Sequence, residues 1–227
     1  MTSYGFDADT SGQSLCAVKE WQDKQIAVGI LLFTYGTVPH PLSVCPDAGP
    51  KVLQITKALI QAEAEKIVNH DGSTDIQYAA ARLSDSLAAA NKRICELNAL
   101  LGQGIYVGGV IVYLSTDQYL AMPFGGAVVY TWNGYYLQPI AQDKSDNLIR
   151  DALGSKEAWE CNCWRARLQE RTSIFCMTEA LLYEDAVSEK LHESMKFASH
   201  PNTASMLLRR ELEHSTQPPS AVLEFKN

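Results

Sequence analysis

The sequence predicts an α+β protein in which helices and strands form separate layers. Its periodic segments follow the order strand, two helices, several strands, two helices, strand, which keeps helices and strands apart along the chain. The segment 76–101 carries an apolar residue at every third or fourth position, as a long amphipathic helix does. The pair Asn133-Gly134 lies between two short apolar runs and is typical of a tight hairpin turn. With 227 residues and no repeat or linker, the chain is expected to form a single domain, 1–227.

Composition and charge argue against several classes of protein. Hydrophobic residues make up 46% and charged residues 20% of the chain, as in ordinary globular proteins. The formal net charge is −7 and the basic residues are scattered, so we expect no nucleic-acid binding. The longest apolar run, 26–33, is far shorter than the ~20 residues that span a membrane. Without a secretory signal pattern at the N-terminus, we expect a cytoplasmic protein with reduced cysteines and no membrane contact.

The first half of the chain predicts one buried strand and two helices. The apolar run 25–33 has the length and the β-branched residues of a buried strand. A helix over 50–68 is expected after a loop rich in Gly and Pro, with Pro50 in its first turn. Its expected core face is Val52, Ile55, Leu59 and Ala62. The helix over 76–101 is expected to pack against a sheet through Ile76, Ala80, Leu83, Leu87, Ala90, Ile94, Leu97 and Leu101.

The second half predicts mainly antiparallel strands joined by short turns. Apolar runs of strand length recur there, and two helical stretches precede the final one. The expected strands are 110–114, 118–122, 127–132, 135–140, 158–167, 172–177 and 221–225, and the expected helical stretches are 144–152, 186–198 and 203–213.

One close cysteine spacing, Cys161-Asn162-Cys163, stands out in this half. A single C-x-C without a second pair or a nearby pair of histidines is weak as a zinc site. Alternation along a strand would place Trp159, Cys161 and Cys163 on one face. We therefore interpret the spacing as part of an ordinary strand.

Four segments, in order, resemble a known family. They are AANKRI at 89–94, GGVIVYLSTDQYLAMPFGGAVVYTWNGYYLQPIAQD at 108–143, DNLIRDALG at 146–154 and RTSIFCMTEALL at 171–182. Their pattern is similar to that of the metal-dependent protein phosphatases of type 2C, the PPM family, and especially to its small bacterial forms. The resemblance implies a four-layer α/β/β/α sandwich of two antiparallel sheets flanked by helices. It also implies a chemistry in which aspartates hold two Mg²⁺ or Mn²⁺ ions, which activate water against a phosphoserine or phosphothreonine.

The chain departs from the family pattern where the family places its metal-binding aspartates. Tyr35-Gly36 stands in place of the first D-G pair, and Gly125-Gly126 stands in place of the G-D of G-D-S-R. Thr178-Glu179 replaces the later S-D pair, and the segment 218–220, Pro-Pro-Ser, replaces the final D-N. A phenol with a pKa of ~10 is neutral at pH 7 and cannot bridge two dications as a carboxylate does. The resemblance thus marks Tyr35, Gly36, Gly125, Gly126, Thr178 and Glu179 as positions of a vestigial site, with the glycine pair expected to form a β-bulge.

These departures lead to the hypothesis of an inactive relative, a pseudophosphatase that needs no cofactor and has no catalytic residues. It would act as a protein-binding, scaffolding or regulatory module in signalling, and a homo-oligomer is compatible with the sequence. The residues expected at a partner surface combine the loop before the first helix with an aromatic hairpin, since aromatic side chains are enriched at interface hot spots. They are Tyr35, His40, Trp132, Tyr135 and Tyr136.

Two alternatives stay open from the sequence. The chain could be a divergent serine/threonine phosphatase that binds Mn²⁺ or Mg²⁺ through other carboxylates, among them Glu179, Asp143 and Asp146. It could also be a sensor that binds a small ligand in the vacated cleft. An independent nucleophilic site is not indicated, because none of the five histidines is spaced with a Ser or Cys as such sites require.

Overall fold

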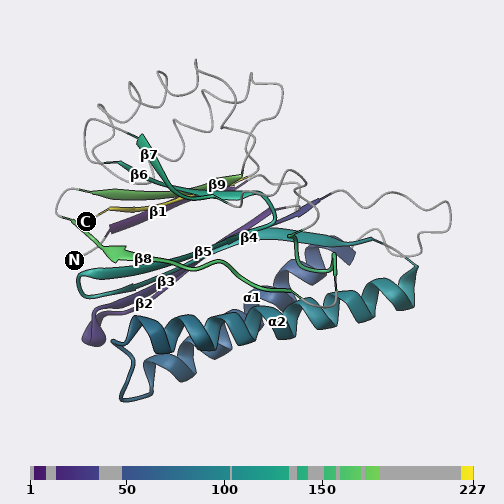
Figure 1. Cartoon of the computed structure of the whole chain (residues 1–227), viewed down its shortest axis with the longest axis horizontal. Coiled ribbons are helices and arrows are strands. Elements are labelled where there is room, and N and C mark those ends of the chain that lie inside the picture. Colours follow the sequence, from purple (N-terminus) through teal and green to yellow (C-terminus); the bar gives the residue numbers. More distant parts are fainter. Residues whose placement is uncertain are drawn as a thin grey trace.

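Two five-stranded antiparallel sheets pack face to face, and a pair of long helices covers one of them (Figure 1). The computed structural model describes residues 3–8, 14–35, 48–102, 104–132, 137–142, 151–156, 159–169, 172–178 and 221–226. The layers confirm the predicted α+β class and the two-sheet sandwich. The expected helices 186–198 and 203–213 lie outside the described residues.

The sheet next to the helices, called here the helix-backed sheet, has the strand order β2-β3-β4-β5-β8. Its strands are β2 (Ser14–Trp21), β3 (Ile26–Tyr35), β4 (Tyr106–Ser115), β5 (Gln118–Phe124) and β8 (Trp164–Arg167), and the short 3-10 helix η1 (Gln22–Lys24) joins the first two. The second sheet has the order β1-β10-β9-β6-β7. Its strands are β1 (Ser3–Ala8), β6 (Ala127–Trp132), β7 (Leu137–Gln142), β9 (Ser173–Thr178) and β10 (Ala221–Lys226).

The two helices are α1 (Ala48–Val68) and α2 (Ile76–Leu101), within two residues of the predicted bounds. Asp75 caps the N-terminus of α2 by accepting a hydrogen bond from the Gln77 amide at 2.8 Å. Gly102 ends the helix in a left-handed conformation, with φ of 61°. The predicted stripe of α2 is buried from Ile76 to Ile94, whereas Leu101 at its end is 40% exposed. The helix packs on the sheet, as predicted, through this stripe.

The predicted core face of α1 is wrong. Val52 is buried, but Ile55 is 50% exposed and Ala62 is also exposed. The helix has apolar residues on two adjacent faces, and the wider apolar face packs against the sheet. The buried residues of α1 are Ala48, Val52, Leu53, Thr56, Ile60, Glu63, Ala64, Ile67 and Val68. Glu63 is the charged member of this set, and it pairs with Lys66 at 3.0 Å and with Arg82 of α2.

Two hydrophobic cores lie on opposite faces of the helix-backed sheet, because alternate residues of a strand point to opposite sides. In β3, Ile30 and Leu32 face the helices, while Leu31 and Phe33 face the second sheet. The predicted buried strand is thus covered on both faces, which explains its continuous apolar run. In β4, Tyr113 belongs to the helix-side core, and its hydroxyl donates a hydrogen bond to the Ser73 carbonyl at 2.6 Å.

Three sequence expectations about strands need correction. The sequence predicted a single strand in the first half, but β1 and β2 are also strands, which pair with β10 and β3. The strand expected over 158–167 is regular only at Trp164–Arg167, although Trp159, Cys161 and Cys163 do share one side, in or against the helix-side core. The series of strands from β4 to β7 is not one sheet, since the chain changes sheets between β5 and β6.

The hairpin of β6 and β7 is confirmed by its register, Trp132 opposite Leu137, with an irregularity between Val129 and Tyr130. Its turn, Asn133-Gly134, lies outside the described residues. Tyr130 and Phe175, on the face of the second sheet away from the inter-sheet core, are buried as well, so that face is also covered. Among the described residues, no helix is long and apolar enough to cross a membrane.

Candidate functional site

The glycine pair Gly125-Gly126 forms the two-residue turn that carries the chain from β5 in one sheet to β6 in the other. Both residues have positive φ, 57° and 79°, which glycine adopts without the strain of a side chain. The β4–β5 register continues without a shift up to Phe124. The prediction of a β-bulge at this pair is therefore wrong. The two glycines instead form the turn by which the chain passes from one sheet to the other.

The turn lies directly against the backbone of β4. A Cβ atom added to Gly125 would lie 2.8 Å from the Cα of Gly108 and 3.0 Å from the Cα of Ala152. A Cβ atom added to Gly108 would lie 2.4 Å from the Gly125 carbonyl oxygen. Glycine is thus required on both sides of this contact. The importance of Gly108 was not recognised from the sequence, although the pair Gly108-Gly109 within an apolar strand was a signal of close backbone approach.

Four of the six vestigial positions, Tyr35, Gly125, Gly126 and Thr178, lie at this end of the sandwich. Gly108 pairs with Phe33, so the end of β3 at Tyr35 lies two residues beyond the contact with the turn. Ala127, the first residue after the turn, pairs with Thr178, the last residue of β9. The ends of β3 and β9 and the start of β6 therefore converge, as the resemblance implies for a site formed at sheet edges. Gly36 and Glu179 follow β3 and β9 directly in the chain but lie outside the described residues.

The residue types at these converging positions do not match a ligand set for hard dications. Mg²⁺ and Mn²⁺ prefer carboxylate oxygens, whereas positions 35 and 126, in place of two of the family's aspartates, supply a phenol and a glycine. Within the described ranges, no three side chains of His, Cys, Asp or Glu gather closely enough to hold a metal ion. The carboxylates Asp143, Asp146 and Glu179 lie outside those ranges, so their contribution stays a prediction.

A short loop, 151–156, supports the glycine turn from the helix side. Leu153 pairs with Val107 of β4 through two backbone hydrogen bonds of 2.9 and 3.0 Å. The buried side chain of Asn91 accepts a hydrogen bond from the Gly154 amide at 2.7 Å and donates one to the Lys156 carbonyl at 2.9 Å. Segments recognised separately in the sequence, AANKRI and the end of DNLIRDALG, are therefore hydrogen-bonded neighbours. Their role at this end is to hold the backbone in place.

The residues expected at a partner surface are only partly described. Tyr35 ends β3, and Trp132 ends β6 with 7% of its surface exposed, so a partner could reach only its edge. His40, Tyr135 and Tyr136 lie outside the described residues. Their role in binding a partner remains a prediction.

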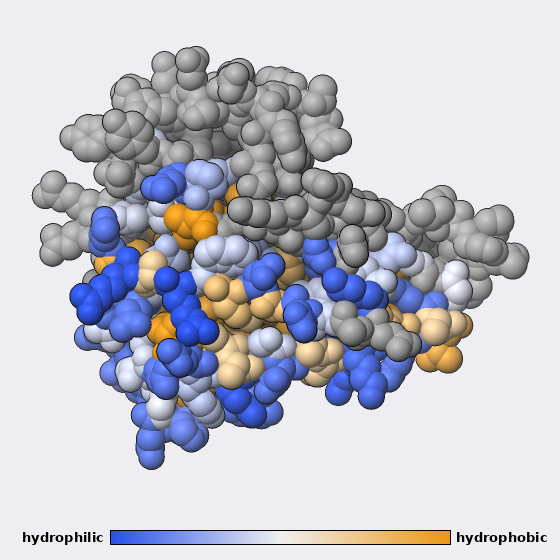
Figure 2. Space-filling model, viewed as in Figure 1, coloured by the Kyte–Doolittle hydropathy of each residue, from blue (hydrophilic) through white to orange (hydrophobic). Residues whose placement is uncertain are grey.

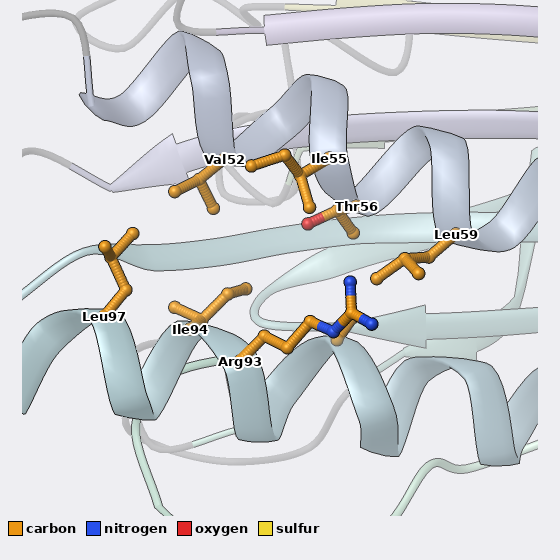
Figure 3. A pocket seen from close by; sticks show the side chains of 8 residues that line it. Val52, Ile55, Thr56, Leu59, Arg93, Ile94 and Leu97 are labelled. Atoms are coloured by element: carbon orange, nitrogen blue, oxygen red, sulfur yellow. The ribbon is translucent and has the colours of Figure 1, made fainter.

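A shallow apolar groove lies between α1 and α2 (Figure 3). Its hollow of about 40 Å³ is smaller than a ligand pocket and is bounded by side chains from both helices. They are Val52, Ile55, Thr56, Leu59, Ala90, Arg93, Ile94 and Leu97. Figure 2 shows hydrophobic and hydrophilic residues mixed over the helix layer, and Leu100, near the end of α2, is 83% exposed.

These layers define the class of protein whose fold the chain has. Two antiparallel sheets with paired helices against one of them, and strand ends that converge beside a glycine turn, form the fold of the type 2C serine/threonine phosphatases. The structural comparison confirms the predicted resemblance at the level of the fold. No protein-family model and no curated protein matches the sequence.

Several solved structures are similar to this chain over nearly its whole length. The serine/threonine phosphatase of S. agalactiae has a TM-score of 0.80 at 12% identity, with 99% of each chain covered. PppA, described as a key regulatory component of T6SS in Pseudomonas aeruginosa, has a TM-score of 0.71 at 17% identity, covering 99% of this chain and 96% of its own. The catalytic domain of the phosphatase PstP, solved with two manganese ions, has a TM-score of 0.70 at 14% identity and covers 99% and 97%.

Proposed function

We propose that this chain is a catalytically inactive protein with the type 2C phosphatase fold, which acts in the cytoplasm as a protein-binding or regulatory module. One observation carries the proposal. The backbone that would present metal ligands is kept at the converging ends of β3, β6 and β9, while positions 35 and 126, which stand in place of two of the family's aspartates, carry no carboxylate. A folded scaffold without the ligands for two dications retains its surfaces for binding but lacks the means to activate water.

The first test is a calorimetric titration of Mn²⁺ into chelator-treated protein, combined with an assay on a phosphoserine peptide. We expect no saturable heat and no phosphate release, while circular dichroism reports a folded protein. Binding at an integral stoichiometry together with phosphate release would overturn the proposal in favour of a divergent phosphatase. The variant Glu179→Ala would then decide whether that carboxylate belongs to the site, because its removal should abolish both signals.

A second test restores the carboxylates. The double variant Tyr35→Asp with Gly126→Asp returns two acidic residues to the converging strand ends. Aspartate tolerates the left-handed backbone of position 126 better than most residues, so the fold should persist. We expect this variant to bind Mn²⁺ more tightly than the parent chain. A matched control, Tyr35→Asn with Gly126→Asn, has the same shape without the charge and should leave metal binding at the parent's level.

The proposed binding role is tested on its own. Tyr35→Ala and Trp132→Ala are compared with the parent chain in capture experiments with cross-linking and mass spectrometry. A specific partner whose capture is lost with Tyr35→Ala would support the proposal of a protein-binding module. Ligand-dependent thermal stabilisation by small metabolites, without any protein partner, would instead favour the sensor alternative.

A further inference from the structure

Cys161 and Cys163 lie together on a short irregular segment directly before β8. Residues 159–163 form no strand, and the β5–β8 ladder begins only at Trp164, which pairs with Ala121. Both thiols are partly exposed and pack against the helix-side core, on the same side of the segment. No sheet hydrogen bonds therefore hold the two residues apart.

The two sulfur groups interact with each other. The Cys161 thiol donates a weak hydrogen bond to the Asn162 carbonyl at 3.4 Å, and the Cys163 thiol donates one to the Cys161 carbonyl at 3.9 Å. A hydrogen bond from the Cys161 thiol to a Cys163 thiolate, together with the exposed Arg165 guanidinium, favours a negative charge on Cys163. These two effects outweigh the opposing effect of burial, and together they lower the pKa of Cys163 to about 7. A thiol of this kind is substantially ionised at neutral pH, and the thiolate is the form that reacts with peroxides.

Backbone geometry allows the two sulfurs to bond. Residues two apart in a chain have Cα atoms at most about 7 Å apart, just beyond the usual disulfide range of about 4.4–6.8 Å, so the disulfide needs this non-strand segment to bend slightly from full extension. The other described cysteines differ from this pair. Cys176 is fully buried, where burial raises its pKa, and the partly exposed Cys16 and Cys95 have no second cysteine within two positions in the chain.

We propose that Cys161 and Cys163 form a redox-active thiol pair, a modification site that hydroperoxides convert reversibly into an intramolecular disulfide. The Cys163 thiolate attacks a peroxide oxygen, the O–O bond breaks, and the leaving oxygen departs as water or an alcohol after taking up a proton. Cys163 is then a sulfenic acid. The Cys161 sulfur attacks it, the S–S bond forms, the S–O bond breaks, and hydroxide leaves with the Cys161 proton as water. The two thiols lose two electrons, and the peroxide gains them.

The sequence provides a direct readout of this reaction. Trypsin cleaves after Lys156 and Arg165 and releases the peptide 157–165, EAWECNCWR, whose only cysteines are these two. Reduced protein is exposed to hydrogen peroxide, the remaining thiols are alkylated, and the peptide is weighed. We expect a peptide that carries no alkyl group and is lighter by two hydrogens, and that returns to the doubly alkylated form after dithiothreitol.

Variants distinguish the role of Cys163, which attacks the peroxide, from that of Cys161, which attacks the sulfenic acid. Cys161→Ala removes the second thiol, so Cys163 should stop at a sulfenic acid that dimedone traps. Cys95→Ala, a matched control at another partly exposed thiol, should leave formation of the peptide disulfide unchanged. Recovery of the parent peptide with both thiols alkylated after peroxide, or with sulfinic acid in place of the disulfide, would overturn the proposal. Because every readout is chemical, the outcome is independent of whether the chain binds a metal or a partner.

Discussion

At the scale of single residues, two glycines share a left-handed backbone but differ in their surroundings. Gly125 has φ of 57° and lies against the backbones of Gly108 and Ala152, whereas Gly102 has φ of 61° with no atom within 4 Å of an added Cβ. Replacement of Gly102 by alanine should cost only the backbone strain, while the same change at Gly125 adds a steric clash with two backbones. Comparing the two replacements therefore distinguishes the cost of backbone strain from the cost of the steric clash.

We predict that Gly102→Ala lowers the free energy of unfolding by ~1 kcal/mol. For Gly125→Ala, strain and overpacking together should cost ~3 kcal/mol. Urea denaturation followed by circular dichroism measures both values. Equal losses in the two variants would show that the close approach of the turn to β4 does not constrain the fold.

A second prediction at this scale concerns the pH dependence of Cys163. Its pKa is lowered to about 7, so its thiolate is present above that pH and is lost as the pH falls through it. The rate of alkylation by iodoacetamide, followed on the peptide 157–165, should therefore reach half its plateau near pH 7. Cys161→Ala removes the hydrogen-bond donor and should move the midpoint toward the ~8.5 of a free thiol. Arg165→Gln should move it in the same direction by a smaller amount, and an unchanged midpoint in both variants would contradict these causes.

At the scale of elements, α2 fixes the loop that supports the glycine turn. Asn91 is 1% exposed and bonds both the Gly154 amide and the Lys156 carbonyl, so one buried side chain satisfies two backbone groups. Asn98, two turns further, bonds the Ile105 amide and carbonyl at 2.9 Å each. The helix therefore acts through its asparagines as well as through its apolar stripe.

We predict that Asn91→Ala lowers the free energy of unfolding by ~2 kcal/mol, because the Gly154 amide loses its acceptor in a buried place. Hydrogen exchange of residues 151–156 should speed up more than exchange in the strands of the second sheet. Lys92→Ala, an exposed neighbour on the same helix, should change stability by less than ~0.5 kcal/mol. Uniformly faster exchange across the whole chain would indicate global destabilisation in place of a released loop.

The elements differ in how far the sequence predicts them. The bounds of α2 follow from the spacing of its apolar residues, and the two-sided burial of β3 follows from its continuous apolar run. The strand β2 was missed because Lys19 and Glu20 interrupt its second half, although the polar segment 22–24 before Ile26 is a turn signal. The core face of α1 was misplaced because the helix has apolar residues on two sides, and periodicity alone does not say which side meets the sheet.

The candidate site was predictable in part for a related reason. The segments that build it were recognised from short motifs, and the structure brings four of the six vestigial positions together. The function of the glycine pair could not be derived, since its contacts are to Gly108 and Ala152, which belong to other segments of the chain. These segments come together only in the folded structure.

At the scale of the whole molecule, a glycine of one sheet faces an aromatic ring of the other. A Cβ atom added to Gly29 of β3 would lie 2.2 Å from the Phe225 ring of β10, so the ring occupies the space that a side chain would need. We predict that Gly29→Ala destabilises the protein by ~2 kcal/mol. Phe225→Leu, which shortens the opposing side chain, should restore part of that loss in the double variant. Additive effects of the two changes in thermal unfolding would argue against direct contact between the sheets at this point.

The position of β10 in the second sheet affects how the chain folds during synthesis. β10 lies between β1 and β9, and β1 pairs with no other strand in the described part of the sheet. A nascent chain therefore makes β1 first and provides its hydrogen-bonding partner only with residues 221–226. Until then β1 is an open edge, and open edges are prone to wrong pairing. Synthesis of β10 is therefore the event that lets β1 join the rest of the described second sheet.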